Sequence, residues 1–182
     1  MSSSEQFKAK GRLWDRVRSI AFLFPAWFAP HKSLRVFFHR LRGVRIGKDV
    51  EIGYFCIIGN VHPSMVVIED CAVIAARVTI LEHDNSYFYT VGGKVKSAPV
   101  TVEAKAFIGV ASVILPGVTI GAQAIVGCAS VVNRDVPART VVAGAPARII
   151  ENKHANPKAE QPDSSSMPPS ESVQEYVSVN RE

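Results

Sequence analysis

Aliphatic residues recur every six positions along the middle of the chain, and this spacing restricts the possible folds more than any other feature. A helix repeats every 3.6 residues and a strand every two, so neither explains a period of six. A short fixed period is typical of a solenoid, in which three hexads form one triangular coil. We therefore expect a mainly β chain folded as a parallel β-helix. Its inward aliphatic residues would be Ile46, Ile52, Ile58, Ile68, Ile74, Ile80, Val102, Ile108, Ile114, Ile120, Val126 and Val132.

Two other hexad positions fit such a coil. A small or aliphatic residue is frequent at the fifth position, as at Val50, Cys56, Ala72, Val78, Ala106, Ser112, Val118, Ala124 and Ser130. Gly or an acidic residue often follows the inward aliphatic residue, as at Gly47, Gly53, Glu69, Glu103 and Gly109. We expect these glycines where the chain bends or needs unusual dihedral angles. Cys56 would point inward, whereas Cys71 and Cys128 would lie at turns.

Two interruptions of the period divide the chain further. A short bulge is expected at residues 61–64, and an excursion loop leaves the coil at residues 82–97. The solenoid would span residues 44–152, after a basic helical arm at residues 1–43. Residues 153–182 are rich in Pro and Ser and predict a disordered tail.

The amino-acid sequence of the solenoid resembles the sequences of a known enzyme family. The marks are Thr-Ile-Leu-Glu-His at 79–83, Phe-Ile-Gly at 107–109, Pro-Gly-Val-Thr-Ile-Gly at 116–121, Asn-Arg-Asp-Val-Pro at 133–137 and Val-Ala-Gly-Ala-Pro-Ala-Arg at 142–148. They resemble the hexapeptide-repeat acyltransferases, particularly the galactoside, maltose and nodulation-factor O-acetyltransferases. The resemblance implies a left-handed parallel β-helix and a homotrimer. It also implies acetyl-CoA as co-substrate in clefts between subunits, with no permanently bound cofactor.

The resemblance also implies a role for one histidine. The family's catalytic base stands at the start of the excursion, and His83 occupies that position. Acetyl transfer to a hydroxyl needs a base that is mostly neutral near pH 7, which suits imidazole. No metal is expected, because Phe88 stands where the similar gamma-type carbonic anhydrases have a second histidine.

The expected contacts to CoA and to the acceptor rest on different arguments. By resemblance, the CoA-binding residues are Phe107, Gly109, Cys128, Asn133, Arg134 and Arg148. Arg suits the phosphates of CoA because it offers charge-assisted hydrogen bonds. The acceptor side cannot be transferred from the family. By chemistry alone its candidates are Tyr54, Asn60, His62, Asn85 and Tyr87.

The arm has its own charge and its own apolar pattern. Residues 1–45 carry ten Lys/Arg against two acidic residues, a balance of +8, while the whole chain of 182 residues carries +5. Two amphipathic helices are expected, one with Leu13, Val17 and Ile20 on its apolar side and one capped by Ser33. Such helices can lie in a membrane interface or pack on the solenoid, and the sequence leaves both open. No nucleic-acid partner is expected.

These observations together predict an acetyl-CoA-dependent O-acetyltransferase. The acceptor would be a sugar hydroxyl, of a cell-surface glycan or its precursor, and the location cytoplasmic or peripheral on the cytoplasmic membrane face through residues 1–42. The alternatives are an acyltransferase for an amine or for serine, and an inactive solenoid scaffold.

Overall fold

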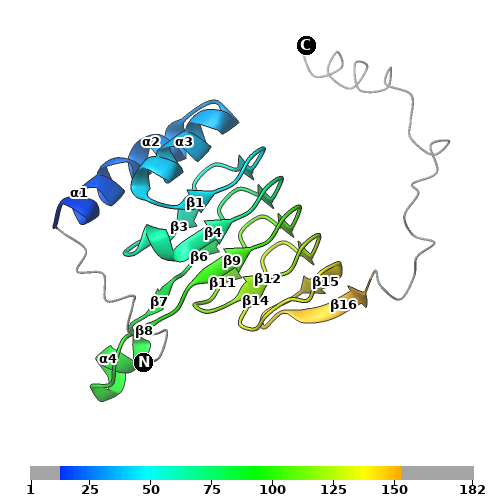
Figure 1. The fold of residues 1–182 in the computed structure, drawn as a ribbon. Helices are drawn as coiled ribbons and strands as arrows, with labels where there is room; N and C mark the ends of the chain where they lie inside the picture. Colours follow the sequence, from blue (N-terminus) through cyan, green and yellow to red (C-terminus); the bar gives the residue numbers. More distant parts are fainter. Residues whose placement is uncertain (1–12, 153–182) are drawn as a thin grey trace, which may run out of the picture. The chain divides into compact units, whose positions relative to one another are not determined.

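The computed structural model describes residues 13–152, so the tail predicted at 153–182 lies outside the described residues. Short parallel strands form three sheets, one on each side of a prism (Figure 1). The first contains β1 (Arg45–Ile46), β4 (Val66–Ile68), β9 (Val100–Val102) and β12 (Thr119–Ile120). The second contains β2 (Glu51–Ile52), β5 (Val73–Ile74), β10 (Phe107–Ile108), β13 (Ile125–Val126), β15 (Thr140–Ala143) and β16 (Arg148–Asn152). The third contains β3 (Ile57–Ile58), β6 (Thr79–Ile80), β11 (Val113–Ile114) and β14 (Val131–Val132).

This topology confirms the predicted mainly β, parallel solenoid. Strands of one sheet lie one coil apart in sequence, as in the pairing of Ile46 with Ile68 and of Ile108 with Val126. The exception is β16, which runs antiparallel to β15. Along the length of the prism, the arm lies beside β1 and the β15–β16 hairpin lies at the opposite end (Figure 1).

The core follows the hexads. Ile46 is partly buried, and the other predicted inward aliphatic residues are fully or almost fully buried. The fifth positions are buried as well, with Cys56 inside and Cys71 and Cys128 exposed at turns, as predicted. Serine is tolerated inside because its hydroxyl finds a backbone acceptor. Both Ser112 Oγ and Ser130 Oγ donate to the Gly127 carbonyl, at 2.9 and 2.7 Å.

Gly47, Gly53 and Gly109 stand at the bends between strands, as expected, but they do not have the unusual dihedral angles also considered, since none of them has a positive φ. A Cβ on Gly53 would lie 2.4 Å from the Ala76 nitrogen, and one on Gly121 would lie 2.4 Å from the Ala138 nitrogen. These glycines are therefore required by the close approach of the next coil. The left-handed turn conformation falls two residues later on non-glycine residues such as Phe55 (φ 58°).

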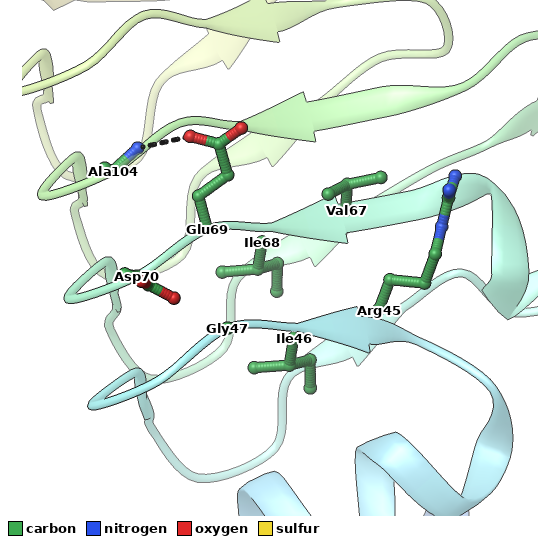
Figure 2. A pocket seen from close by; sticks show the side chains of 8 residues that line it. All are labelled: Arg45, Ile46, Gly47, Val67, Ile68, Glu69, Asp70 and Ala104. Atoms are coloured by element: carbon green, nitrogen blue, oxygen red, sulfur yellow. Dashed lines mark hydrogen bonds between the residues drawn. The ribbon is translucent and has the colours of Figure 1, made fainter.

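Acidic residues in the turns connect neighbouring coils. Glu69 Oε2 accepts a hydrogen bond from the Ala104 backbone N–H at 3.1 Å, and Glu103 repeats this contact one coil on, with Ala122 at 2.8 Å. Figure 2 shows Glu69 reaching toward Ala104 above a shallow hollow that also contains Arg45. These carboxylates satisfy turn amides that the short strands leave unpaired.

Within residues 13–43, the described part of the arm, there are three helices where two were expected. They are α1 (Leu13–Ala21), α2 (Leu23–Phe28) and α3 (Lys32–Arg42). Pro25 has no N–H to donate to the Ala21 carbonyl, which explains the break after α1. The predicted Ser33 cap was wrong: His31 caps α3, and its Nδ1 accepts from the Ser33 backbone N–H at 3.3 Å.

Arginines of α3 hold the arm against the first coil. Arg35 Nε donates to the Ile52 carbonyl at 2.6 Å, and Arg40 donates to the carbonyls of Ile46 and Gly47. Arg42 is 2% exposed and donates to the carbonyls of Ile58 and Gly59 at 3.0 and 3.1 Å. The first coil has no preceding coil to pair with, so these arginines satisfy carbonyls at its open edge.

The two interruptions have regular structure of their own. The predicted bulge contains a 3-10 turn, Pro63–Met65. The excursion is a hairpin of β7 (His83–Asp84) and β8 (Lys96–Ser97), with α4 (Ser86–Val91) between them. It projects from the side of the prism (Figure 1).

Candidate active site

A buried carboxylate lies next to the predicted base. Glu82 and His83 follow β6 after Leu81, where the chain leaves the third sheet for the excursion. Glu82 is fully buried, and its Oε1 lies 3.0 Å from His83 Nδ1. The His83 side chain is 17% exposed, so one edge of the ring is held and solvent still reaches it. A carboxylate can only accept here, so Nδ1 carries the hydrogen and Nε2 carries the lone pair.

Glu82 also organises the preceding coil. Its carboxylate accepts the backbone N–H groups of Asn60 at 3.1 Å, Val61 at 2.8 Å and His62 at 2.8 Å. Burial raises the pKa of Glu82, but the His62 and Val61 N–H groups and His83 outweigh burial and hold the pKa below its ordinary 4.5. Glu82 is therefore ionised at neutral pH and fixes both the bulge and the imidazole.

A buried cation lies on the far side of this network. Burial lowers the pKa of Arg42 to about 10, while the Glu82 charge acts in the opposite direction. Arg42 therefore remains protonated at neutral pH. Its hydrogen bonds to Ile58 and Gly59 fix the residues that lead into the bulge. The arm thus supports the same corner of the prism as Glu82.

The predicted acceptor residues do not all lie at the same place in the structure. Asn60 and His62 lie at the corner of His83, since their backbone N–H groups bind the Glu82 carboxylate. Asn85 caps α4 just after His83, and Tyr87 on α4 is 70% exposed. Tyr54 is not brought to this corner. Its hydroxyl donates to the Pro30 carbonyl at 3.0 Å, and the Arg35 guanidinium lies 4.1 Å from its ring centre.

The predicted CoA contacts form two groups. Asn133, Arg134 and Arg148 line one cleft of about 370 Å³ near the β15–β16 end. Phe107, Gly109 and Cys128 lie together at another corner, between the second and third sheets. A Cβ on Gly109 would lie 2.6 Å from the Cys128 nitrogen, and Phe107 is 41% exposed. His83 lies instead at the corner that follows the third sheet. A single chain therefore does not bring Phe107, Gly109 and Cys128 next to its own His83.

Sequence reasoning missed two residues of the site. Glu82 was part of a family mark but had no predicted role. Its position two residues after the inward Ile80, beside an excursion, was an available signal. Arg42 was treated only as one of the charged residues of the arm, because nothing in the local sequence distinguishes it from the exposed Arg40.

Two other features are absent among residues 13–152. No helix in that range is long and apolar enough to cross a membrane. In the same range, no group of three or more His, Cys, Asp or Glu residues could hold a metal ion. Burial raises the pKa of the Cys56 thiol to about 11, so Cys56 is not an activated nucleophile.

A three-sided parallel solenoid built from hexads defines the class of hexapeptide-repeat proteins. No family model matches the chain. Galactoside O-acetyltransferase of Escherichia coli K12 is 33% identical over 127 residues, which is 69% of this chain and 60% of that protein. A 2,3,4,5-tetrahydropyridine-2,6-dicarboxylate N-acetyltransferase of Enterococcus faecalis is 46% identical over 55 residues, 30% of this chain and 24% of that protein. The chain thus spans 60% and 24% of the lengths of these two relatives.

Solved structures agree on the fold. A galactoside acetyltransferase in complex with coenzyme A superposes with a TM-score of 0.62 at 24% identity, covering 84% of this chain and 91% of that one. A hexapeptide-repeat acetyltransferase of Vibrio cholerae complexed with acetyl coenzyme A gives a TM-score of 0.50 at 24% identity, covering 84% and 98%. The sequence and structure likenesses confirm the predicted resemblance to the hexapeptide-repeat acetyltransferase family.

Proposed function

We propose that the protein transfers an acetyl group from acetyl-CoA to a hydroxyl, with His83 as general base. The observation that carries this proposal is the Glu82–His83 pair, whose 3.0 Å contact leaves Nε2 as the free lone pair of a partly exposed imidazole. The likeness to a galactoside O-acetyltransferase supports a sugar hydroxyl, of a cell-surface glycan or its precursor.

The proposed reaction is direct transfer. Nε2 of His83 removes the hydroxyl proton as the oxygen attacks the thioester carbonyl, and the tetrahedral intermediate then expels the thiolate of CoA. The proton on His83 goes to that thiolate, so the products are the acetyl ester and CoA. The Glu82 carboxylate stabilises the imidazolium formed on the way. Neither Cys71 nor Cys128 takes part, although both are exposed.

The proposed assembly is a homotrimer of left-handed prisms with acetyl-CoA bound between subunits. The separation of the His83 corner from the Phe107–Cys128 corner supports this, because a neighbouring copy could supply the missing corner. Asn133, Arg134 and Arg148 would bind CoA phosphates. A cytoplasmic location with peripheral membrane contact through residues 1–42 belongs to the same proposal.

One observation favours a second candidate, an amine acceptor. The 46% identity to an N-acetyltransferase is high, although it covers only 55 residues. The test is CoA release from acetyl-CoA with matched panels of sugars, cell-envelope intermediates, amines and serine. Turnover with hydroxyl sugars supports the O-acetyltransferase, and turnover with amines alone contradicts it. Absence of acetyl-CoA binding at millimolar concentration in isothermal titration would instead indicate a scaffold.

A further inference from the structure

The arm exposes its apolar side chains, because the arginines that should have been its polar surface are directed inward. Arg35 and Arg42 are buried and bind carbonyls of the first coil. We call the exposed apolar side chains Val17, Ile20, Phe24, Phe28 and Phe55 the arm face; their exposed fractions are 46–63%. Apolar side chains this exposed need a partner when they adjoin one another.

The arm face is continuous around its aromatic residues. The rings of Phe24 and Phe28 are 6.4 Å apart between centroids, and those of Phe28 and Phe55 are 5.5 Å apart. Val17 and Ile20 lie three residues apart on α1, and Phe24 follows on α2 after the break between the two helices. The ring contacts link α2 to the first coil, and α1 packs beside α2 at the same end of the prism (Figure 1).

The surroundings of the arm face are basic. Arg18 on α1, next in sequence to Val17, is exposed. Arg40 and Arg45 of α3 and β1 are exposed as well. An apolar helical face with cationic residues beside it is typical of helices that lie in a lipid interface.

We propose that the arm face docks on the surface of an anionic membrane. A second copy fits poorly, because end-to-end contact would bring together two arms with a charge balance of +7 each. An anionic leaflet offers both the apolar interior and the complementary charge. The inference rests on the membrane contact already proposed for residues 1–42 and deepens it by naming the side chains that enter the membrane and the charge of the lipid; it does not depend on the proposed acetyl transfer. Vesicle binding is measured without turnover, so the two proposals can fail separately.

The test is flotation of the full chain with phosphatidylcholine vesicles, with and without about one third phosphatidylglycerol. The variant is Phe24→Ser with Phe28→Ser, and its matched control is Phe88→Ser with Tyr89→Ser, which removes two exposed aromatic residues from α4. Circular dichroism checks that both variants fold. We expect wild type and control to bind anionic vesicles at least about tenfold better than neutral ones. The arm variant should lose at least about tenfold of that binding.

Several results would overturn the inference. These are equal binding to both vesicle types, no binding to either, or an arm variant that binds like wild type. A concentration-dependent doubling of mass that the arm variant abolishes would make a second copy the occupant. Binding that appears only after deletion of residues 153–182 would make the chain's own tail the occupant.

Discussion

At the candidate site, Glu82 orients the imidazole of His83, which is the residue proposed to transfer the proton. Glu82 is buried, ionised and bonded to three backbone N–H groups and to one imidazole. Its geometry selects the tautomer of His83 in the way that a buried carboxylate orients a catalytic histidine elsewhere.

Glu82→Gln should therefore lower kcat by about 10²-fold with little change in CoA affinity. An amide no longer stabilises the imidazolium, but solvent still reaches the ring and limits the loss. The matched control is Glu103→Gln, a carboxylate that binds a turn amide at another corner. Equal loss of rate in both variants, or unchanged rate in Glu82→Gln, would contradict the assigned role. Thermal melting of each separates loss of fold from loss of rate.

His39 predicts a pH dependence of stability that is independent of catalysis. Burial, and secondarily Arg42, lower the pKa of His39 to about 3 from its ordinary 6.5. Below pH 6.5, His39 is therefore protonated in the unfolded chain but stays neutral in the folded chain. The free energy of unfolding falls as the pH drops below 6.5. Between pH 7.5 and 5 the free energy of unfolding should fall by about 2 kcal/mol from this residue. Urea unfolding of wild type and His39→Gln measures it; an equal fall in both would refute the assignment.

At the scale of elements, the hexad period was enough to predict most of the fold. Side chains that point inward every six residues leave little choice of packing, so the three sheets and both interruptions were predictable from Ile52, Ile80 and their equivalents. For the candidate site, the resemblance supplied His83 and the CoA contacts, and these assignments stay predictions. The inward direction of Arg35 and Arg42 could not be predicted, because it depends on which carbonyls of the first coil lack a donor from a neighbouring coil.

Arg42→Met tests how strongly the arm supports the first coil. The variant leaves the carbonyls of Ser19, Ile58 and Gly59 without their buried donor, so the free energy of unfolding should fall by about 3–5 kcal/mol. Hydrogen exchange at residues 58–62 should accelerate in the same variant. The control is Arg139→Met, whose exposed guanidinium binds Gln123, with an expected change within about 0.5 kcal/mol. Similar effects of the two variants would show that Arg42 is not the anchor.

At the scale of the whole molecule, the division of the predicted site between two corners favours an interface. A trimer should give a mass near three times 19.8 kDa by light scattering. Co-expression of His83→Ala with Cys128→Trp, a change at an exposed position of the second corner, should restore about a quarter of the wild-type rate. In a random mixture, half of the subunits supply an intact His83 and half of their neighbours supply an intact Cys128. A fully active monomer, or no recovery in mixed oligomers that form normally, would contradict the shared site.

The most direct measurement of the central claim is acetyl transfer by His83→Ala. Loss of the base should lower turnover by about 10²–10⁴-fold, while isothermal titration shows nearly unchanged affinity for acetyl-CoA, because the imidazole acts on the acceptor hydroxyl. His31→Ala, which removes an exposed histidine from the arm, should keep the wild-type rate. A His83→Ala variant that binds acetyl-CoA and retains more than about a tenth of wild-type turnover would show that His83 is not the general base.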